Sequence, residues 1–140
     1  MQLIVWPDEL PFGEGGNAVV VESLVAALRE RGHTVDLVAL PWKWYPRESF
    51  VSSVLAWRLL DLTEANGQPI DLVIATKFPS YVVRHPRKVT WLVHQYRQAY
   101  DWFGSPLSDL TSSPEDVRFR RWLRAMDRTT LAASRGLYAI

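Results

Sequence analysis

The stretch Leu3-Ile4-Val5-Trp6-Pro7-Asp8-Glu9-Leu10-Pro11-Phe12-Gly13-Glu14-Gly15-Gly16 opens the chain with an apolar run and then a loop rich in proline and glycine. The apolar run predicts a short strand over residues 2–6. A helix is predicted over residues 16–31, because apolar residues recur at helical spacing and Gly32 follows as a helix stop. The rest of the chain repeats this unit of strand, loop and helix.

Further apolar runs predict buried strands over residues 33–40, 71–75 and 88–94. The first of these is expected to bury Val35, Leu37, Val38 and Leu40. Residues 76–87 contain two prolines and are expected to form a loop with a short helical turn. Gly136 precedes another apolar run, which predicts the opening of a strand at residues 137–140.

Residues 48–63 carry the apolar spacing of a second helix, which Asn66-Gly67 is expected to end. Its inward positions are predicted to be Val51, Val54, Leu55, Leu59 and Leu62. Residues 95–112 are polar and aromatic, with Gly104 and Pro106, and are expected to form an ordered loop.

The last helix has a strong start signal: Ser113 as the cap, Pro114 at the first helical position and two acids after it. It is predicted to reach about Ser134, with Phe119, Trp122, Leu123 and Met126 on its apolar side. Two stripes of arginine follow the same helix. Two interpretations stay open for them: a solvated face paired in part with Asp116 and Asp127, or contact with an anionic membrane surface or acceptor. The arginines are Arg118, Arg120, Arg121, Arg124 and Arg128.

Apolar strands that alternate with amphipathic helices are typical of a parallel sheet covered on both faces. The prediction is therefore an α/β protein, a single Rossmann-like domain over residues 1–140. A net charge of +1 gives no reason to expect nucleic-acid binding, and zero cysteines exclude disulfides and thiolate metal sites. No apolar run is long enough for a membrane span and no secretory signal precedes the first strand, so a cytoplasmic location is expected.

The seven tryptophans are many for a chain of 140 residues. Trp42, Trp44, Trp91 and Trp102 fall in or beside predicted loops and strand ends. They fit either core and loop packing or contact between an aromatic face and a sugar or partner.

The glycines at residues 13–16 stand before a helix, where backbone N–H groups attract anions and small residues let a phosphate approach. The pattern is not the dinucleotide fingerprint, because six residues separate Trp6 from Gly13. The second strand also lacks the acid that would hold a ribose. A nicotinamide-dependent oxidoreductase is therefore disfavoured.

Taken together, several segments resemble the N-terminal, acceptor-side domain of glycosyltransferase family 4, the retaining enzymes of GT-B fold. These segments are Gly15-Gly16, Leu28-Arg29-Glu30-Arg31-Gly32-His33-Thr34-Val35, Ala75-Thr76-Lys77-Phe78-Pro79-Ser80-Tyr81, Arg84-His85-Pro86 and Trp91-Leu92-Val93-His94-Gln95-Tyr96-Arg97-Gln98-Ala99-Tyr100-Asp101. The resemblance implies one half of a GT-B fold. It also implies transfer of a sugar from a nucleotide-diphosphate sugar to a glycan or lipid-linked acceptor, without a metal or other cofactor.

Carried over residue by residue, the resemblance makes Gly15 and Gly16 the loop near the donor diphosphate and His94 the active-site histidine. Lys77 and Arg84 become candidates for phosphate or acceptor contact. Either a structural or a functional role stays open for His85.

The donor-binding half of such enzymes is a C-terminal domain, which this sequence lacks, so the chain alone is expected not to turn over. The rival expectation is a non-catalytic remnant or partner-dependent domain. Such a domain would self-associate as a homo-oligomer or pair with a separate chain that carries the C-terminal domain.

Overall fold

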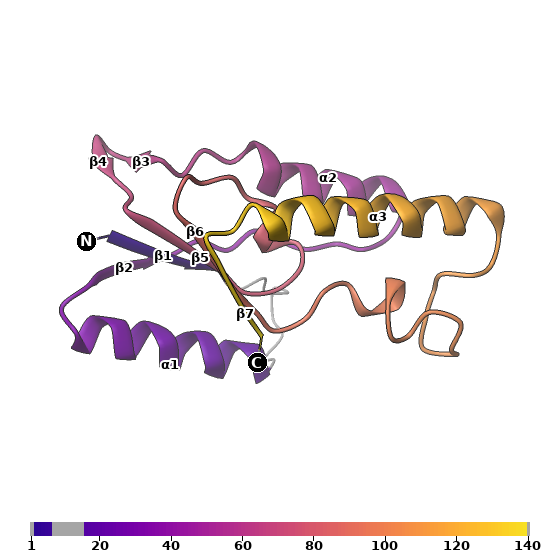
Figure 1. Cartoon of the computed structure of the whole chain (residues 1–140), viewed down its shortest axis with the longest axis horizontal. Helices are drawn as coiled ribbons and strands as arrows, with labels where there is room; N and C mark the ends of the chain where they lie inside the picture. Colours follow the sequence, from indigo (N-terminus) through magenta and orange to yellow (C-terminus); the bar gives the residue numbers. More distant parts are fainter. Residues whose placement is uncertain (1, 7–15, 140) are drawn as a thin grey trace.

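The computed structural model describes residues 2–6 and 16–139, and its elements alternate between strand and helix along the chain (Figure 1). Among these residues, 3₁₀ turns cover Ser80–Val82 (η1) and Arg97–Ala99 (η2). The helices and strands are β1 (Gln2–Trp6), α1 (Gly16–Glu30), β2 (Thr34–Leu37), α2 (Arg47–Leu59), β3 (Glu64–Ala65), β4 (Gln68–Pro69), β5 (Leu72–Ala75), β6 (Lys88–Leu92), α3 (Pro114–Ala132) and β7 (Gly136–Ala139).

The main sheet has the order β2-β1-β5-β6-β7, and every neighbouring pair in it is parallel. In Figure 1, α1 lies on one side of this sheet, and α2 and α3 lie on the other. The protein is thus an α/β fold with a small open parallel sheet, as the alternating pattern predicts. The crossover from β5 to β6 contains only η1, which confirms the expected loop with a short helical turn.

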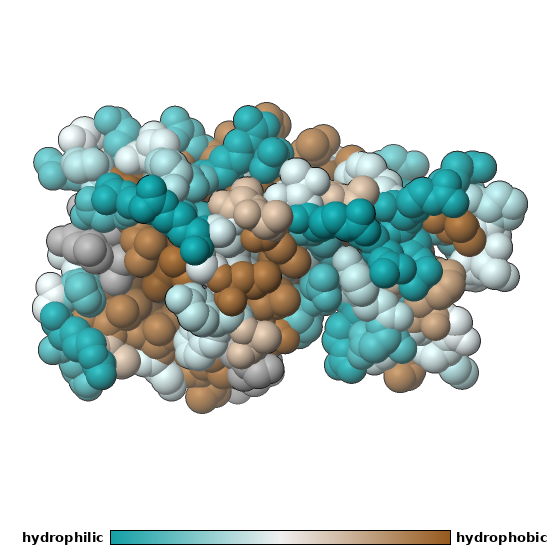
Figure 2. Space-filling view, viewed as in Figure 1, coloured by the Kyte–Doolittle hydropathy of each residue, from teal (hydrophilic) through white to brown (hydrophobic). Residues whose placement is uncertain are grey.

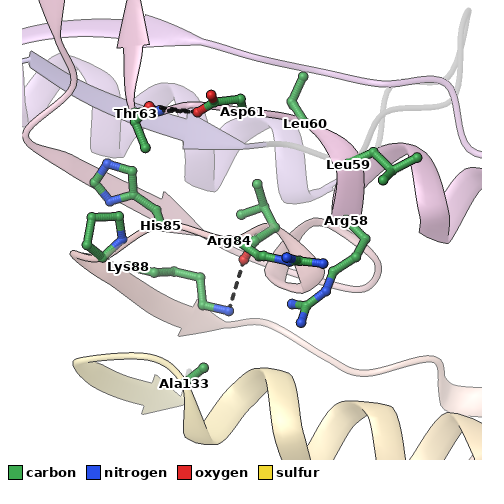
Figure 3. Close-up of a pocket in the computed structure, with 11 residues that line it drawn as sticks. Arg58, Leu59, Leu60, Asp61, Thr63, Arg84, His85, Lys88 and Ala133 are labelled. Atoms are coloured by element: carbon green, nitrogen blue, oxygen red, sulfur yellow. Dashed lines mark hydrogen bonds between the residues drawn. The ribbon is translucent and has the colours of Figure 1, made fainter.

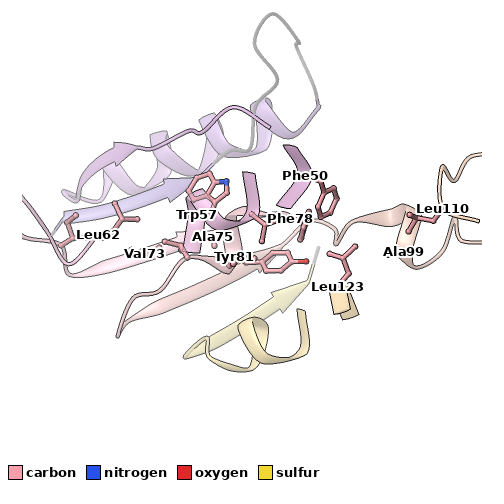
Figure 4. Close-up of a cluster of buried hydrophobic side chains, with 14 residues drawn as sticks. Phe50, Trp57, Leu62, Val73, Ala75, Phe78, Tyr81, Ala99, Leu110 and Leu123 are labelled. Carbon is pink, nitrogen blue, oxygen red and sulfur yellow. The ribbon is translucent and has the colours of Figure 1, made fainter. Parts of the chain in front are cut away.

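Alternating residues of the central strand β5 supply two hydrophobic cores, one on each face of the sheet. Ile74 packs with Val21 and Val25 of α1 and with Val35 of β2. Val73 and Ala75 belong to the larger core under α2 and α3 (Figure 4). The other members of that core are Phe50, Val54, Trp57, Leu62, Ile70, Phe78, Tyr81, Val82, Val83, Ala99, Leu110 and Leu123.

The prediction of a fully buried second strand is wrong. β2 covers only Thr34–Leu37, and of its side chains Val35 alone is buried, while Leu37 is 46% exposed. The reason is its place in the sheet: β2 pairs with β1 on one side and is the outer strand on the other. Val38 and Leu40 follow the strand and are partly buried against the larger core.

The second helix also ends earlier than predicted, at Leu59. Its buried residues are Phe50, Val54 and Trp57, whereas Leu55 and Leu59 are 48% and 78% exposed. Asn66-Gly67 does not end this helix. The pair forms the two-residue turn between β3 and β4, with φ angles of 52° and 75°.

The last helix begins as predicted, because the Ser113 side chain accepts a hydrogen bond from the Asp116 N–H at 3.2 Å and Pro114 follows as the first helical residue. Leu123 is fully buried, but Trp122 is 41% exposed. The buried stripe includes the polar residues Asp127 and Thr130. Asp127 therefore lies inside the protein, and the expectation that it pairs with the surface arginines is wrong.

Three of the four tryptophans at the predicted loops and strand ends pack against a core. Trp42 and Trp44 are partly buried against the larger core, and Trp91 lies against the smaller one. The Trp42 ring contacts Phe50 at 4.9 Å and Phe78 at 5.4 Å between ring centroids.

Candidate functional site

Two of the predicted site residues lie together where β5 and β6 end. Lys77 follows β5 and His94 follows β6, and these are parallel neighbours in the sheet. Their hydrogen-bond ladder continues past the strands, from the Val93 N–H to the Thr76 carbonyl oxygen at 2.9 Å and from the Phe78 N–H to the His94 carbonyl oxygen at 3.2 Å. The backbone segments that carry Lys77 and His94 are thus hydrogen-bonded to each other at this edge of the sheet.

The His94 ring is exposed, and its Nδ1 atom lies 2.8 Å from the carbonyl oxygen of Gln95. Because a carbonyl oxygen can only accept a hydrogen bond, Nδ1 carries the proton. In the neutral form of the ring, the Nε2 atom is then a lone-pair acceptor. Nε2 is therefore the atom through which the neutral ring can accept a hydrogen bond from a ligand hydroxyl.

A cavity of about 210 Å³ lies beside His94, between the end of β6, η2 and the end of β7. On its wall the guanidinium of Arg97 donates to the Asp101 carboxylate from Nε at 3.1 Å and from a terminal nitrogen at 2.8 Å. The same guanidinium stacks on the Trp102 ring, 4.3 Å from its centroid. The hydrogen bond from Arg97 lowers the pKa of Asp101, so this wall carries a fixed ion pair.

Tyr100 also lines this cavity, and its hydroxyl is hydrogen-bonded to the buried carboxylate of Asp127. Its hydroxyl donates to one Asp127 oxygen at 2.5 Å, and the Tyr81 hydroxyl donates to the other at 2.8 Å. Burial raises the pKa of Asp127, while these two hydrogen bonds oppose the rise. The network fixes the rotamer of Tyr100 from inside the core.

Gly16 is the first residue of α1, the helix that follows β1. The last residue of β1 pairs with Ala75 of β5, so α1 begins on the same edge of the sheet as Lys77 and His94 (Figure 1). The N-terminus of a helix attracts anions through its free N–H groups. Gly15, the other predicted loop residue, lies outside the described residues.

The structure does not bring Arg84 together with the other predicted site residues. Arg84 comes before β6, whereas His94 comes after it, so the two lie at opposite edges of the parallel sheet. Residues 76–87 cross the sheet from the end of β5 to the start of β6 with η1 but without an α-helix. Arg84 lines a different cavity at the amino edge, together with Arg58, His85 and Lys88.

The amino-edge cavity measures about 550 Å³ and lies between the end of α2, the start of β6 and the end of α3 (Figure 3). Beside it, the buried ammonium of Lys88 donates to the carbonyl oxygens of Tyr81 at 2.6 Å, Thr130 at 2.8 Å and Val83 at 3.3 Å. Burial, and to a smaller degree the Arg58 charge, lowers the pKa of Lys88 to about 8.

Sequence reasoning missed Lys88, Asp127 and Arg58. The first two had a signal, since each is a charged residue at a position where the apolar pattern demands an inward side chain. Lys88 begins a buried strand, and Asp127 lies four residues after Leu123 on the same helix face. Arg58 had no such signal, because only the tertiary fold brings α2 beside Arg84.

Within residues 2–6 and 16–139, no three histidine or acidic side chains come together at metal-binding distance. None of the helices in the same residues combines the length and apolarity that a membrane span requires.

A comparison with known proteins returned no matching family, no matching curated protein and no matching solved structure.

Proposed function

We propose that this chain is the acceptor-side half of a retaining glycosyltransferase of GT-B fold, with its site at the carboxyl edge of the sheet. One observation carries the proposal: Lys77 and His94 are neighbours on the joined loops that follow β5 and β6. In doubly wound α/β folds, ligands bind at this edge, beside the point where the strand order reverses. Counted along the chain, the main-sheet strands have the order 2-1-3-4-5, an order known from doubly wound folds, and this likeness supports the proposal.

In this proposal the transferred sugar lies against His94, whose Nε2 accepts a hydrogen bond from a sugar hydroxyl. The leaving diphosphate lies at the start of α1, where the backbone N–H groups of the glycine loop stabilise its charge. The ammonium of Lys77 adds a positive charge on the same side. A second domain or chain supplies the contacts to the base and ribose, so this chain alone binds donor weakly and does not transfer.

The test is calorimetric titration of the purified chain with nucleoside diphosphates and their sugar conjugates. We expect binding with Kd of about 1 mM, lost in His94→Ala and in Gly16→Val. His33→Ala is the matched control, because His33 lies beyond the other end of α1. The proposal is contradicted if no binding is detected, or if His33→Ala weakens binding as much as His94→Ala does. Transfer by the isolated chain would contradict its partner-dependent form.

A second candidate is a non-catalytic, partner-dependent domain. It is favoured by β7, which pairs with β6 on one side and is the outer strand of the described sheet on the other. Leu137 and Tyr138 on this strand are 51% and 62% exposed, and hydrophobic surface gathers in this region (Figure 2). Exposed apolar strand edges favour association. Light scattering behind size exclusion tests this: a mass above 16.1 kDa that falls in Tyr138→Lys supports it. A monomer at every concentration contradicts self-association through this edge.

A further inference from the structure

We propose that the amino-edge cavity is a binding site for a small phosphomonoester, whose phosphoryl group is bound by the guanidinium groups of Arg58 and Arg84. The amino-edge cavity lies at the opposite edge of the sheet from the carboxyl-edge site and shares no residue with it. The fold brings cations from three separate elements together there. Arg58 comes from α2, Arg84 from the segment before β6, and Lys88 from β6 itself.

The cationic groups converge without an anion between them. Figure 3 shows the guanidinium of Arg84 beside that of Arg58, with the Lys88 ammonium close by. Within the described residues, neither guanidinium forms an ion pair, and Arg58 has only a long hydrogen bond to the Val82 carbonyl oxygen at 3.3 Å. Burial, and the Arg84 charge after it, lowers the pKa of Arg58. The charges therefore repel one another, and a bound anion would relieve that repulsion.

The other polar groups of the cavity are already engaged. His85 accepts the Arg87 N–H at Nδ1 and contacts the Ile70 carbonyl oxygen through Nε2, each at 3.0 Å, so its ring is neutral and fixed. Asp61 accepts hydrogen bonds from the Thr63 N–H and hydroxyl, and in Figure 3 it turns toward Thr63, away from the guanidiniums. The Lys88 ammonium donates its hydrogen bonds to three carbonyl oxygens, so it has none left for a ligand. Its charge still adds to the positive potential of the cavity.

The charge and shape of the cavity point to a phosphomonoester. Two guanidiniums match the two negative charges of a phosphoryl dianion, whereas a carboxylate would leave one of them unbalanced. The cavity of about 550 Å³ falls within the size range of small-molecule sites. Leu59, Leu60 and Pro86 line it as well and would contact the organic part of the ligand.

The test is a titration of the full chain with phenyl phosphate, followed through backbone amide signals in two-dimensional NMR. We expect the signals of residues 58–61 and 84–88 to shift, with Kd of about 1 mM or lower. Benzoate, which has the same ring and one negative charge, is expected to bind at least about tenfold more weakly. Inorganic phosphate is expected to bind more weakly than phenyl phosphate, because it lacks a group for the apolar wall.

The variants Arg58→Gln and Arg84→Gln are each expected to weaken binding about tenfold, since each removes a charged donor. Arg118→Gln is the matched control: it removes the same charge from an exposed position in the first turns of α3 and is expected to change nothing. Arg84 is itself exposed, so Arg84→Gln keeps the test valid even if Arg58→Gln fails to fold. The proposal is overturned if no signals shift, if residues 94–101 respond in their place, or if Arg118→Gln weakens binding as much as Arg84→Gln. Equal binding of benzoate and phenyl phosphate also overturns it.

Discussion

The Lys88 ammonium lies 2.8 Å from the carbonyl oxygen of Thr130, and this contact joins the first residue of β6 to the last turns of α3. Two more carbonyl oxygens, of Tyr81 and Val83, complete its hydrogen bonds. Among the described residues no carboxylate pairs with this lysine, and a buried lysine of this kind is unusual. Its hydrogen bonds join the sheet, η1 and α3, and because its pKa differs between the folded and the unfolded chain, stability is expected to depend on pH.

The first prediction concerns pH. The pKa of Lys88 falls from 10.5 to about 8 in the folded protein, so the unfolded chain binds more protons between these values. Stability is therefore expected to rise from pH 8 toward pH 10, by roughly 3 kcal/mol at most. Burial raises the pKa of Tyr81 and Tyr100, so the unfolded phenols lose protons first and stability falls again above pH 10. Urea unfolding across this pH range checks the maximum, and a flat profile from pH 7 to 10 would contradict it.

The second prediction concerns the Asp127 network. Asp127→Ala leaves the hydroxyls of Tyr81 and Tyr100 without their acceptor, and we expect it to lower the free energy of unfolding by about 2–4 kcal/mol. Asp127→Asn keeps an acceptor oxygen and is expected to lose only about 1 kcal/mol. Asp36→Ala, at an exposed position on β2, is the control. Equal effects of Asp127→Ala and Asp36→Ala in urea unfolding would show that the network adds no stability.

The third prediction concerns acid. The Arg47 guanidinium donates to Asp116 at 2.6 Å, and this bond, with those from Thr111, lowers the pKa of Asp116 to about 2. A lowered carboxyl pKa stabilises the fold above about pH 4, and the contribution is lost as pH falls toward 2. Because water reaches part of the pair, we expect the loss to be roughly 1 kcal/mol. Arg47→Gln should flatten the stability profile between pH 4 and 2. An unchanged acid slope in this variant would exclude the ion pair as the cause.

The fourth prediction concerns the hairpin of β3 and β4. Gly67 has a φ of 75°, a conformation that residues with a Cβ adopt at a cost. Gly67→Ala is expected to lower the free energy of unfolding by about 1 kcal/mol. Asn66→Gly leaves the turn compatible and serves as the control. Thermal unfolding of both variants is the measurement, and equal midpoints would contradict the prediction.

Local sequence signals predicted a helix or strand end correctly where the residues at that end determine its position. The cap at Ser113 and Pro114 located α3 because capping uses atoms within one turn. Leu37 and Leu59 were misjudged because their exposure depends on what lies beside β2 and beyond the end of α2. Apolar pattern alone does not distinguish an outer strand from a central one.

The same distinction applies to the candidate site: residues that directly follow a strand could be placed from the sequence, and a residue within a loop could not. Lys77 and His94 could be grouped from the sequence, because each directly follows a predicted parallel strand and strand ends share one edge. Arg84 could not be separated from them, although it is only seven residues beyond Lys77. Its place depends on the path of residues 76–87 across the sheet, which contains no periodic signal.

The joined loops after β5 and β6 have a mechanical consequence. Since backbone hydrogen bonds run from Val93 to Thr76 and from Phe78 to His94, the two loops are linked to each other through their backbones. A ligand that displaces one loop must either break these hydrogen bonds or move the other loop as well. Substitutions of Lys77 and His94 should therefore be non-additive in a double-mutant cycle, even for a ligand that touches only one of the two side chains.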